Sequence, residues 1–248
     1  MKVKFQIEID CTKEGYTAAD LKDRVRDNLS GDGWYHLESI QILTAEPKTK
    51  IIPIFTAAEL KAKHAAGFTA AHQSYVSDVI HQEPWFDSVY DDFLTIAGIL
   101  GFTVARGDIA FSGFSSQGDG ASFTGSAVFL PDAVRCIKEH APLDETLHHI
   151  TDRCGRFGVE GIHARLTRHG SRYYHAQTVD VEAFLLEEGE EVSLTSGYAS
   201  EVTVCCRDLM DWLYRRLERE YEHVTSEEVF LEVAASNGWE YNQAGKME

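Results

Sequence analysis

Hydrophobic and polar residues alternate at the start of the chain, in the segment KVKFQIEID. This period of two predicts a half-buried strand, and the four-residue spacing that follows predicts a helix. Residues 35–43 return to a strand-like pattern, and AEPKTK at 45–50 is typical of a linker. We therefore expect a small strand–helix–strand (βαβ) module over residues 1–50 and a main domain over residues 51–248. The apolar positions that carry this expectation are Val3, Phe5, Ile7, Ile9, Leu21, Val25 and Leu29.

Apolar residues recur every three or four positions from residue 56 to residue 100, which predicts helices. The first begins after Thr56 and is expected to end at Gly67, and residues 69–81 form the next. Pro84 is expected to open a third helix. Its predicted buried stripe consists of Phe86, Val89, Phe93, Ile96 and Leu100.

The second half of the chain carries three more helical patterns. Two short segments on either side of Pro142 predict a pair of short helices. A longer pattern predicts one extended helix, and Thr225 with Glu228 forms a possible capping box for a last helix through Ala235. The stripe of the extended helix is Val202, Cys206, Leu209, Leu213, Leu217 and Tyr221.

Two segments have the pattern of β-hairpins. Residues 109–127 alternate on both sides of SQGDG, and residues 162–167 and 173–181 flank RHGS. The acid-rich residues 187–191 read as a loop. Together with the helices, these hairpins predict an α+β fold in which antiparallel strands pack against several helices.

The stretch FSGFSSQGDGASFTG, residues 111–125, also resembles catalytic loops at first sight. A nucleophile elbow requires a glycine where Gln117 stands. A phosphate-binding P-loop requires a lysine, and none occurs between Lys63 and Lys138. A dinucleotide fingerprint would open a helix, whereas ASFTGSAVF alternates like a strand. We therefore interpret the stretch as a hairpin and predict no catalytic residues.

This hairpin sequence resembles a family of proteins carried by bacteriophages and other mobile elements, often labelled antitoxin-like. The resemblance continues through YDDFLTIAGILGF, IKEHAPLDETLHHI, RHGSRYYH and LMDWLYRRLEREYEHVTSEE, and it covers residues 82–248. The chain departs from the pattern at Ser115, where many relatives are expected to have an aromatic residue. The resemblance implies a mobile-element context, in which small accessory proteins of the host cytosol often neutralise host proteins.

The net charge of −17 is unevenly distributed, since residues 182–248 hold 16 acidic and 5 basic side chains. Such a field repels nucleic-acid phosphates and attracts basic protein surfaces; general solubility is the simpler explanation for it. Our first hypothesis is a non-enzymatic inhibitor, of the anti-CRISPR, anti-defence or antitoxin type, that binds a basic host protein or nucleoprotein complex. Its expected contacts are Glu187, Glu188, Glu190, Glu191, Asp208, Asp211 and Glu218.

The alternative is an RNA-binding or RNA-cleaving protein. The segment RLTRHGSRYYH lies in the one region with net positive charge, and arginines beside aromatic residues suit single-stranded nucleic acid. Histidine adds possible acid–base chemistry. The residues concerned are Arg165, Arg168, His169, Arg172, Tyr173 and His175. A gene regulator is disfavoured because no helix-turn-helix with a basic recognition helix is visible.

The remaining features favour a protein without a cofactor. No export signal is visible and the five cysteines are an odd number, so we expect reduced thiols and a cytoplasmic location. No apolar run is long enough for a membrane span. A zinc site from Cys136, His140, His148, His149 and Cys154 lacks the usual close ligand pairs, so no metal is predicted. The adjacent Cys205 and Cys206 are expected to be packing residues.

Overall fold

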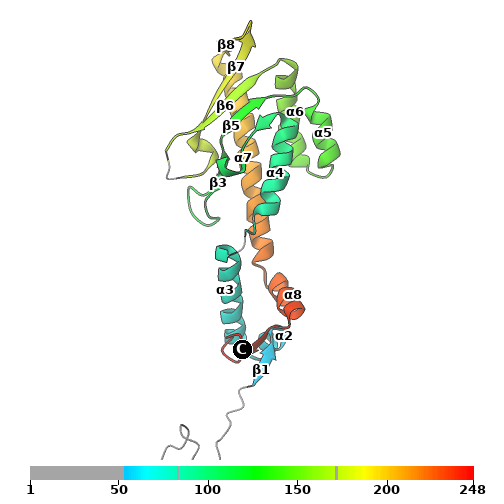
Figure 1. Ribbon diagram of the computed structural model, residues 1–248, viewed down its shortest axis with the longest axis vertical. Helices are drawn as coiled ribbons and strands as arrows, with labels where there is room; N and C mark the ends of the chain where they lie inside the picture. The colour runs from blue at the N-terminus through cyan, green and yellow to red at the C-terminus, as the bar shows by residue number, and fades with distance from the viewer. Residues whose placement is uncertain (1–52, 83, 171–172) are drawn as a thin grey trace, which may run out of the picture. The chain divides into compact units, whose positions relative to one another are not determined.

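The structure is a computed structural model that describes residues 53–82, 84–170 and 173–248. The module predicted over residues 1–50 lies outside these residues. Pro53–Glu248 form one compact unit of helices and antiparallel strands (Figure 1), so the predicted α+β class is confirmed. The elements are β1 Ile54–Thr56, α2 Ala57–Lys63, α3 Ala65–Gln82, α4 Asp87–Leu100, β2 Phe102–Thr103, η1 Arg106–Asp108, β3 Ile109–Phe111, β4 Ala121–Phe123, β5 Gly125–Val128, α5 Ala133–His140, α6 Glu145–Val159, β6 His163–Arg168, η2 Ala176–Thr178, β7 Val179–Glu187, β8 Glu190–Ser193, α7 Ser196–Val224, α8 Glu227–Asn237 and β9 Glu240–Asn242.

The larger hydrophobic core lies around a five-stranded antiparallel sheet with the order β2–β5–β6–β7–β8. Helix α7 packs on β7 and on β4 of a separate two-stranded sheet, and α4 packs beside it (Figure 1). Phe93 of α4 and Phe123 of β4 are fully buried and lie against each other. The core therefore joins the five-stranded sheet, the β3–β4 hairpin and both helices.

Helix α7 is the extended helix that the sequence predicts. It has 29 residues, which at the rise of an α-helix corresponds to about 44 Å. Its predicted stripe is buried from Val202 to Leu217, whereas Tyr221 is half-buried. The short helices α5 and α6 lie on either side of Pro142 and pack against each other, as predicted.

A second, smaller core contains residues from β1, α2, α3, α8 and β9. Phe230 of α8 is fully buried in it, and the rings of Phe68 and Tyr75 pack within 5.6 and 5.2 Å of it. Thr56 caps α2, with a complete capping box to Glu59. This core forms without residues from the five-stranded sheet.

Two predicted helix boundaries near this core are wrong. Gly67 does not end a helix but lies buried inside α3. A glycine is required there because a Cβ atom would lie 2.2 Å from the carbonyl oxygen of Gln243. The cap of α8 is Ser226, which accepts the amide of Val229, rather than Thr225. The hydroxyl of Thr225 instead donates to the carbonyl of Tyr221 in the last turn of α7.

The strand patterns were also only partly correct. The first hairpin consists of β3 and β4 alone, since Gly125 begins β5, which pairs with β2 and β6. In the second, β6 pairs with β7, but β7 starts at Val179 rather than Tyr173 because η2 occupies residues 176–178. The expected loop at 187–191 is the end of another hairpin, β7–β8.

Candidate partner-binding surface

The loop of the β3–β4 hairpin, residues 112–120, is organised by the carboxylate of Asp119. Its Oδ2 atom accepts hydrogen bonds from the amides of Ser115 and Ser116, at 3.0 and 2.6 Å. The hydroxyl of Ser112 accepts the amide of Gly120 at 3.2 Å. These polar groups are therefore used to hold the loop in shape, as in a structural hairpin.

Aromatic side chains fasten the same loop to the helices. Phe114 packs on Tyr214 and Tyr221 of α7, with ring centroids 5.5 and 5.0 Å apart, and on Phe111 of β3. The hydroxyl of Tyr214 also donates to the carbonyl of Gly113. The loop is thus bound to α7 both by ring packing and by a hydrogen bond.

The glycine at position 120 has a packing reason of its own. A Cβ atom on Gly120 would lie 2.5 Å from the Cβ of His175 and 2.8 Å from its Cα. The backbone of the loop therefore contacts the 174–175 segment at a distance that only glycine permits. Together with the Asp119 and Phe114 contacts, this approach gives the motif a structural explanation.

The β7–β8 hairpin has a different character, because its tip is acidic and exposed. Glu187 and Glu190 lie directly opposite each other, and Glu188 and Gly189 form the two-residue turn between them. Both turn residues have positive φ, 54° and 91°, as a type I′ turn requires. Within the described ranges, Glu187, Glu188 and Glu190 form no ion pair, and we call these three residues the acidic tip.

The fourth glutamate of this segment is engaged on the outer face of the sheet. Arg165 of β6 binds Glu182 of β7 and Glu191 of β8, at 2.8 and 2.7 Å. The guanidinium also lies over the ring of Phe184, 5.3 Å from its centroid. The charge of Glu191 is therefore balanced by Arg165, unlike the charges of the acidic tip.

The acidic residues predicted on α7 lie among arginines. Asp208 forms an ion pair with Arg153 of α6, and Asp211 lies one turn before Arg215. Asp208, Asp211 and Arg215 line a surface hollow of about 670 Å³ beside α5 and α6. Desolvation raises the pKa of Asp211, although its side chain still reaches solvent, while Arg215 and His175 oppose that shift. Because charges of both signs alternate here, this part of the predicted acidic surface is nearly balanced.

Glu218 lies near the C-terminal end of α7, whereas the acidic tip precedes the N-terminal end of this helix. Its carboxylate contributes to a raised pKa of Tyr214, for which burial is the larger cause. The structure therefore does not bring the seven predicted acidic contacts together. Three of them form the acidic tip, and the others lie beside arginines or on the distant part of α7.

The residues of the predicted basic hairpin are also divided. Arg165 and Arg168 are three positions apart in β6, so their side chains point to opposite faces of the sheet. Arg168 donates to the buried hydroxyl of Ser122 and lies over the ring of Tyr174. Arg172 lies outside the described residues. The two described arginines therefore do not form one basic surface.

The remaining residues of that set follow β6 or precede β7. His169 forms a 2.9 Å contact with Asp180, and Nδ1 of His175 accepts the amide of Gln177. Tyr173 is exposed and its ring lies 3.6 Å from where a Cβ of Gly118 would be. The basic segment thus lies against the loop of the first hairpin.

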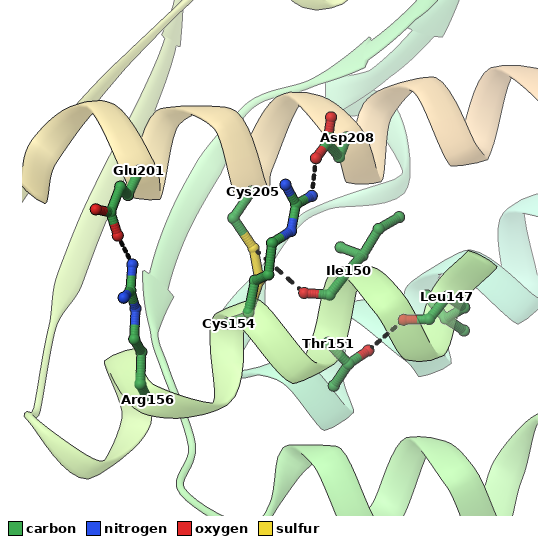
Figure 2. Close-up of a disulfide and its surroundings, with 9 residues drawn as sticks. Leu147, Ile150, Thr151, Cys154, Arg156, Glu201, Cys205 and Asp208 are labelled. Atoms are coloured by element: carbon green, nitrogen blue, oxygen red, sulfur yellow. Dashed lines mark hydrogen bonds and ion pairs between the residues drawn. A yellow bond between two sulfur atoms is a disulfide. The ribbon is translucent and has the colours of Figure 1, made fainter. Parts of the chain in front are cut away.

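The structure corrects the expectation of reduced thiols for two of the five cysteines. Cys154 of α6 and Cys205 of α7 are both buried and form a disulfide, with Cα atoms 6.4 Å apart. Figure 2 shows the bond between the Arg156–Glu201 ion pair and Asp208. Asp208 binds Arg153 of α6, so two ion pairs also join α6 to α7. A bridge over a sequence separation of 51 contributes about 4 kcal/mol in the chain-entropy account.

The other cysteine and histidine residues of the candidate zinc site are spread out. Cys136 contacts Asp132, His140 contacts Asp92, and His148 contacts the carbonyl of Ala141. Cys206 is a buried packing residue as expected, and burial raises the pKa of its thiol to about 12. In residues 53–82, 84–170 and 173–248, no three metal-binding side chains come together.

The sequence reading missed the β7–β8 hairpin and the disulfide. Two-residue spacing between LLE and EEV was the available signal for the hairpin, but Glu-Gly is an uncommon turn pair. No spacing rule connects cysteines 51 positions apart. None of the helices in the described part of the chain is long and apolar enough to cross a membrane.

Comparison with known proteins gives one match. No curated protein and no solved structure matches the chain. The family described as Domain of unknown function (DUF8835) matches residues 85–227, which is more than half of the chain, and the protein therefore belongs to that family.

Proposed function

We propose that this protein acts by stoichiometric binding to a protein or nucleoprotein with a basic surface, through the acidic tip of the β7–β8 hairpin. The observation that carries the proposal is the set of three exposed carboxylates at Glu187, Glu188 and Glu190 that have no cationic partner within the described ranges. Like charges that face each other across a hairpin lower its stability. A basic partner would remove that repulsion on binding.

The first hairpin supports a binding role in a different way. The carboxylate of Asp119 and the hydroxyl of Ser112 accept backbone amides of the loop, so these two polar side chains of the stretch that resembles catalytic motifs are used internally. The matched family range 85–227 includes both hairpins and excludes most of the smaller core. The acidic tip is therefore part of the family region.

The biological setting of this binding is also a proposal. The sequence resemblance to proteins of bacteriophages and mobile elements suggests that the partner belongs to a host defence or toxin system. The bound partner would then be neutralised because its basic surface is covered. RNA binding is the weaker candidate, since Arg165 is matched by two glutamates and lies on the opposite face from Arg168.

Tagged full-length protein tests the proposal in parallel pull-downs from host lysate, with and without nuclease treatment. We expect a stoichiometric protein partner whose capture weakens as salt rises, because exposed charges are screened. The triple variant Glu187→Gln, Glu188→Gln, Glu190→Gln should capture at least tenfold less of the partner.

The matched control removes the same charge elsewhere, with Glu222→Gln, Glu232→Gln and Glu240→Gln. These three glutamates are exposed and have no ion pair in the described part of the chain. Equal capture by both triple variants and the parent would contradict the proposed role of the acidic tip. Recovery of RNA in place of a nuclease-resistant protein would favour the alternative.

A further inference from the structure

Strand β8 forms a free edge of the five-stranded sheet. It pairs with β7 on one side, and no other described strand pairs with it. All four residues of β8 are exposed. The opposite edge, β2, has only two residues, which is one of the ways in which proteins protect a sheet edge. The β8 edge therefore presents more unpaired backbone than the β2 edge does.

The register identifies the backbone groups that face this edge. In a two-residue hairpin, the pair next to the turn exchanges both hydrogen bonds, and the following pairs alternate. Glu187 and Glu190 close the turn, and the next pairs are Leu186–Glu191, Leu185–Val192 and Phe184–Ser193. The amides and carbonyls of Glu191 and Ser193 consequently point away from β7, towards an added strand.

The side chains along the edge define what such a strand must carry. Leu186 and Val192 are 48% and 37% exposed, so they offer apolar contacts at the edge. The acidic tip lies directly beside them, and no lysine or proline occurs in β8 to block pairing. A second copy of this chain would bring the same carboxylates, and the two tips would repel each other.

We propose that the β8 edge receives an extended, lysine- or arginine-rich segment of the partner as an added sixth strand. This inference rests on the proposed function and specifies how the acidic tip recognises its partner. Backbone hydrogen bonds to Glu191 and Ser193 hold the segment, as in other cases of strand addition. Its basic residues lie beside the acidic tip, and an apolar residue covers Val192.

A synthetic peptide tests the backbone part of this recognition. The probe is acetyl-Lys-Lys-Val-Thr-Val-Lys-Lys-amide, which has a basic residue pair at each end and β-branched residues in the middle. A second peptide has the same sequence with N-methyl groups on alternate central amides, so it keeps its charge but cannot donate from one edge. Binding of both to the full-length protein is measured by isothermal titration calorimetry at fixed salt.

We expect the N-methylated peptide to bind at least tenfold more weakly than the parent peptide. Ser193→Pro should weaken binding of the unmethylated peptide to a similar degree, because proline removes an amide that faces the edge without removing a hydrogen bond to β7. Ser193→Ala is the matched control and should bind like the parent protein. The peptide comparison stays decisive even if Ser193→Pro disturbs folding.

Equal binding of the two peptides, or no binding of either, would overturn strand addition. If both peptides bind equally and the acidic-tip triple variant loses both, the charge-based proposed function stands and only the strand addition fails. If the triple variant captures the partner from lysate as well as the parent does, the proposed function itself fails. The two failures therefore have different signatures.

Discussion

The β3–β4 and β7–β8 hairpins belong to the same compact unit but use their residues in different ways. In β3–β4, a long loop is fixed by Asp119, by the ring of Phe114 and by the contact of Gly120 with His175. In β7–β8, a two-residue turn carries carboxylates that contact no cation in the described part of the chain. The loop of the first hairpin is packed against α7, whereas the second hairpin contributes Val179 and Ala183 to the core but leaves its acidic tip free to contact another molecule.

This difference predicts unequal costs when side chains are removed. Phe123 of β4 is fully buried, with the rings of Phe93 and Phe102 at 5.0 and 5.6 Å. We expect Phe123→Ala to lower the free energy of unfolding by about 3–5 kcal/mol, since it leaves a cavity. Leu186→Ala, in the second hairpin, should change it by less than about 0.5 kcal/mol.

Urea unfolding of both variants measures these values, provided that the slope with urea concentration stays constant. A loss of several kcal/mol for Leu186→Ala would show that the end of the β7–β8 hairpin next to the turn also packs as part of the core. The proposal of a free edge would then need another explanation for its exposed apolar residues.

The next largest effect concerns the glycine that lets the first hairpin approach its neighbour. Gly120→Ala places a methyl group against His175 and should cost about 1–3 kcal/mol, because the loop or the 174–175 segment must shift. Gly107→Ala is the control, since no atom lies within 4 Å of its Cβ position. That variant should be neutral or gain up to about 1 kcal/mol. Thermal unfolding of the pair would distinguish packing from a general effect of glycine.

The two hairpins also show what could and could not be predicted from the sequence. Periodicity over many turns predicted α7, because its stripe from Val202 to Leu217 faces one continuous core. The same reasoning failed where the cause lay in a distant segment. Gly67 looked like a helix end, but its neighbour is the carbonyl of Gln243. The residues next to Gly67 in the sequence do not reveal a contact with a segment so far along the chain.

The candidate site was predictable only in its charge. The concentration of acidic residues after residue 181 was visible in the sequence, but their arginine partners were not. Arg153 and Arg165 neutralise Asp208 and Glu191 through contacts between different elements. The β8 edge was missed because glutamates have a low preference for strands, so the segment was read as a loop.

A smaller effect is expected at the turn of the second hairpin. Glu188 is the one non-glycine residue with positive φ in the described ranges, and asparagine adopts that conformation more readily. We expect Glu188→Asn to raise the free energy of unfolding by about 0.5–1 kcal/mol. The same variant should bind the basic partner more weakly, because it removes one carboxylate of the acidic tip.

Glu188→Gln is the matched variant, because it removes the charge but keeps an unbranched side chain at the same φ. This variant should also bind the basic partner more weakly, but without the same gain in the free energy of unfolding. If Glu188→Asn is less stable than the parent, the turn does not favour asparagine and the comparison of the two hairpins loses one of its arguments.

The smallest effect concerns Asp211, an acidic residue of α7 that lines the hollow beside α5 and α6 and is not part of the acidic tip. Desolvation raises its pKa in the folded state, against the opposing influence of Arg215 and His175. The folded protein therefore binds this proton more tightly than the unfolded chain does, and ionisation at neutral pH disfavours folding. That unfavourable contribution disappears as the pH falls through the folded pKa to below the ordinary pKa of aspartate.

Asp211→Asn should consequently be slightly more stable than the parent at pH 7, and the difference should vanish near pH 3. Urea unfolding at both pH values measures it. A loss of stability at pH 7 that vanishes at low pH would mean that Arg215 and His175 hold Asp211 as a favourable anion. The acidic residues of α7 would then contribute to folding, and the free carboxylates of the acidic tip would differ from them even more sharply.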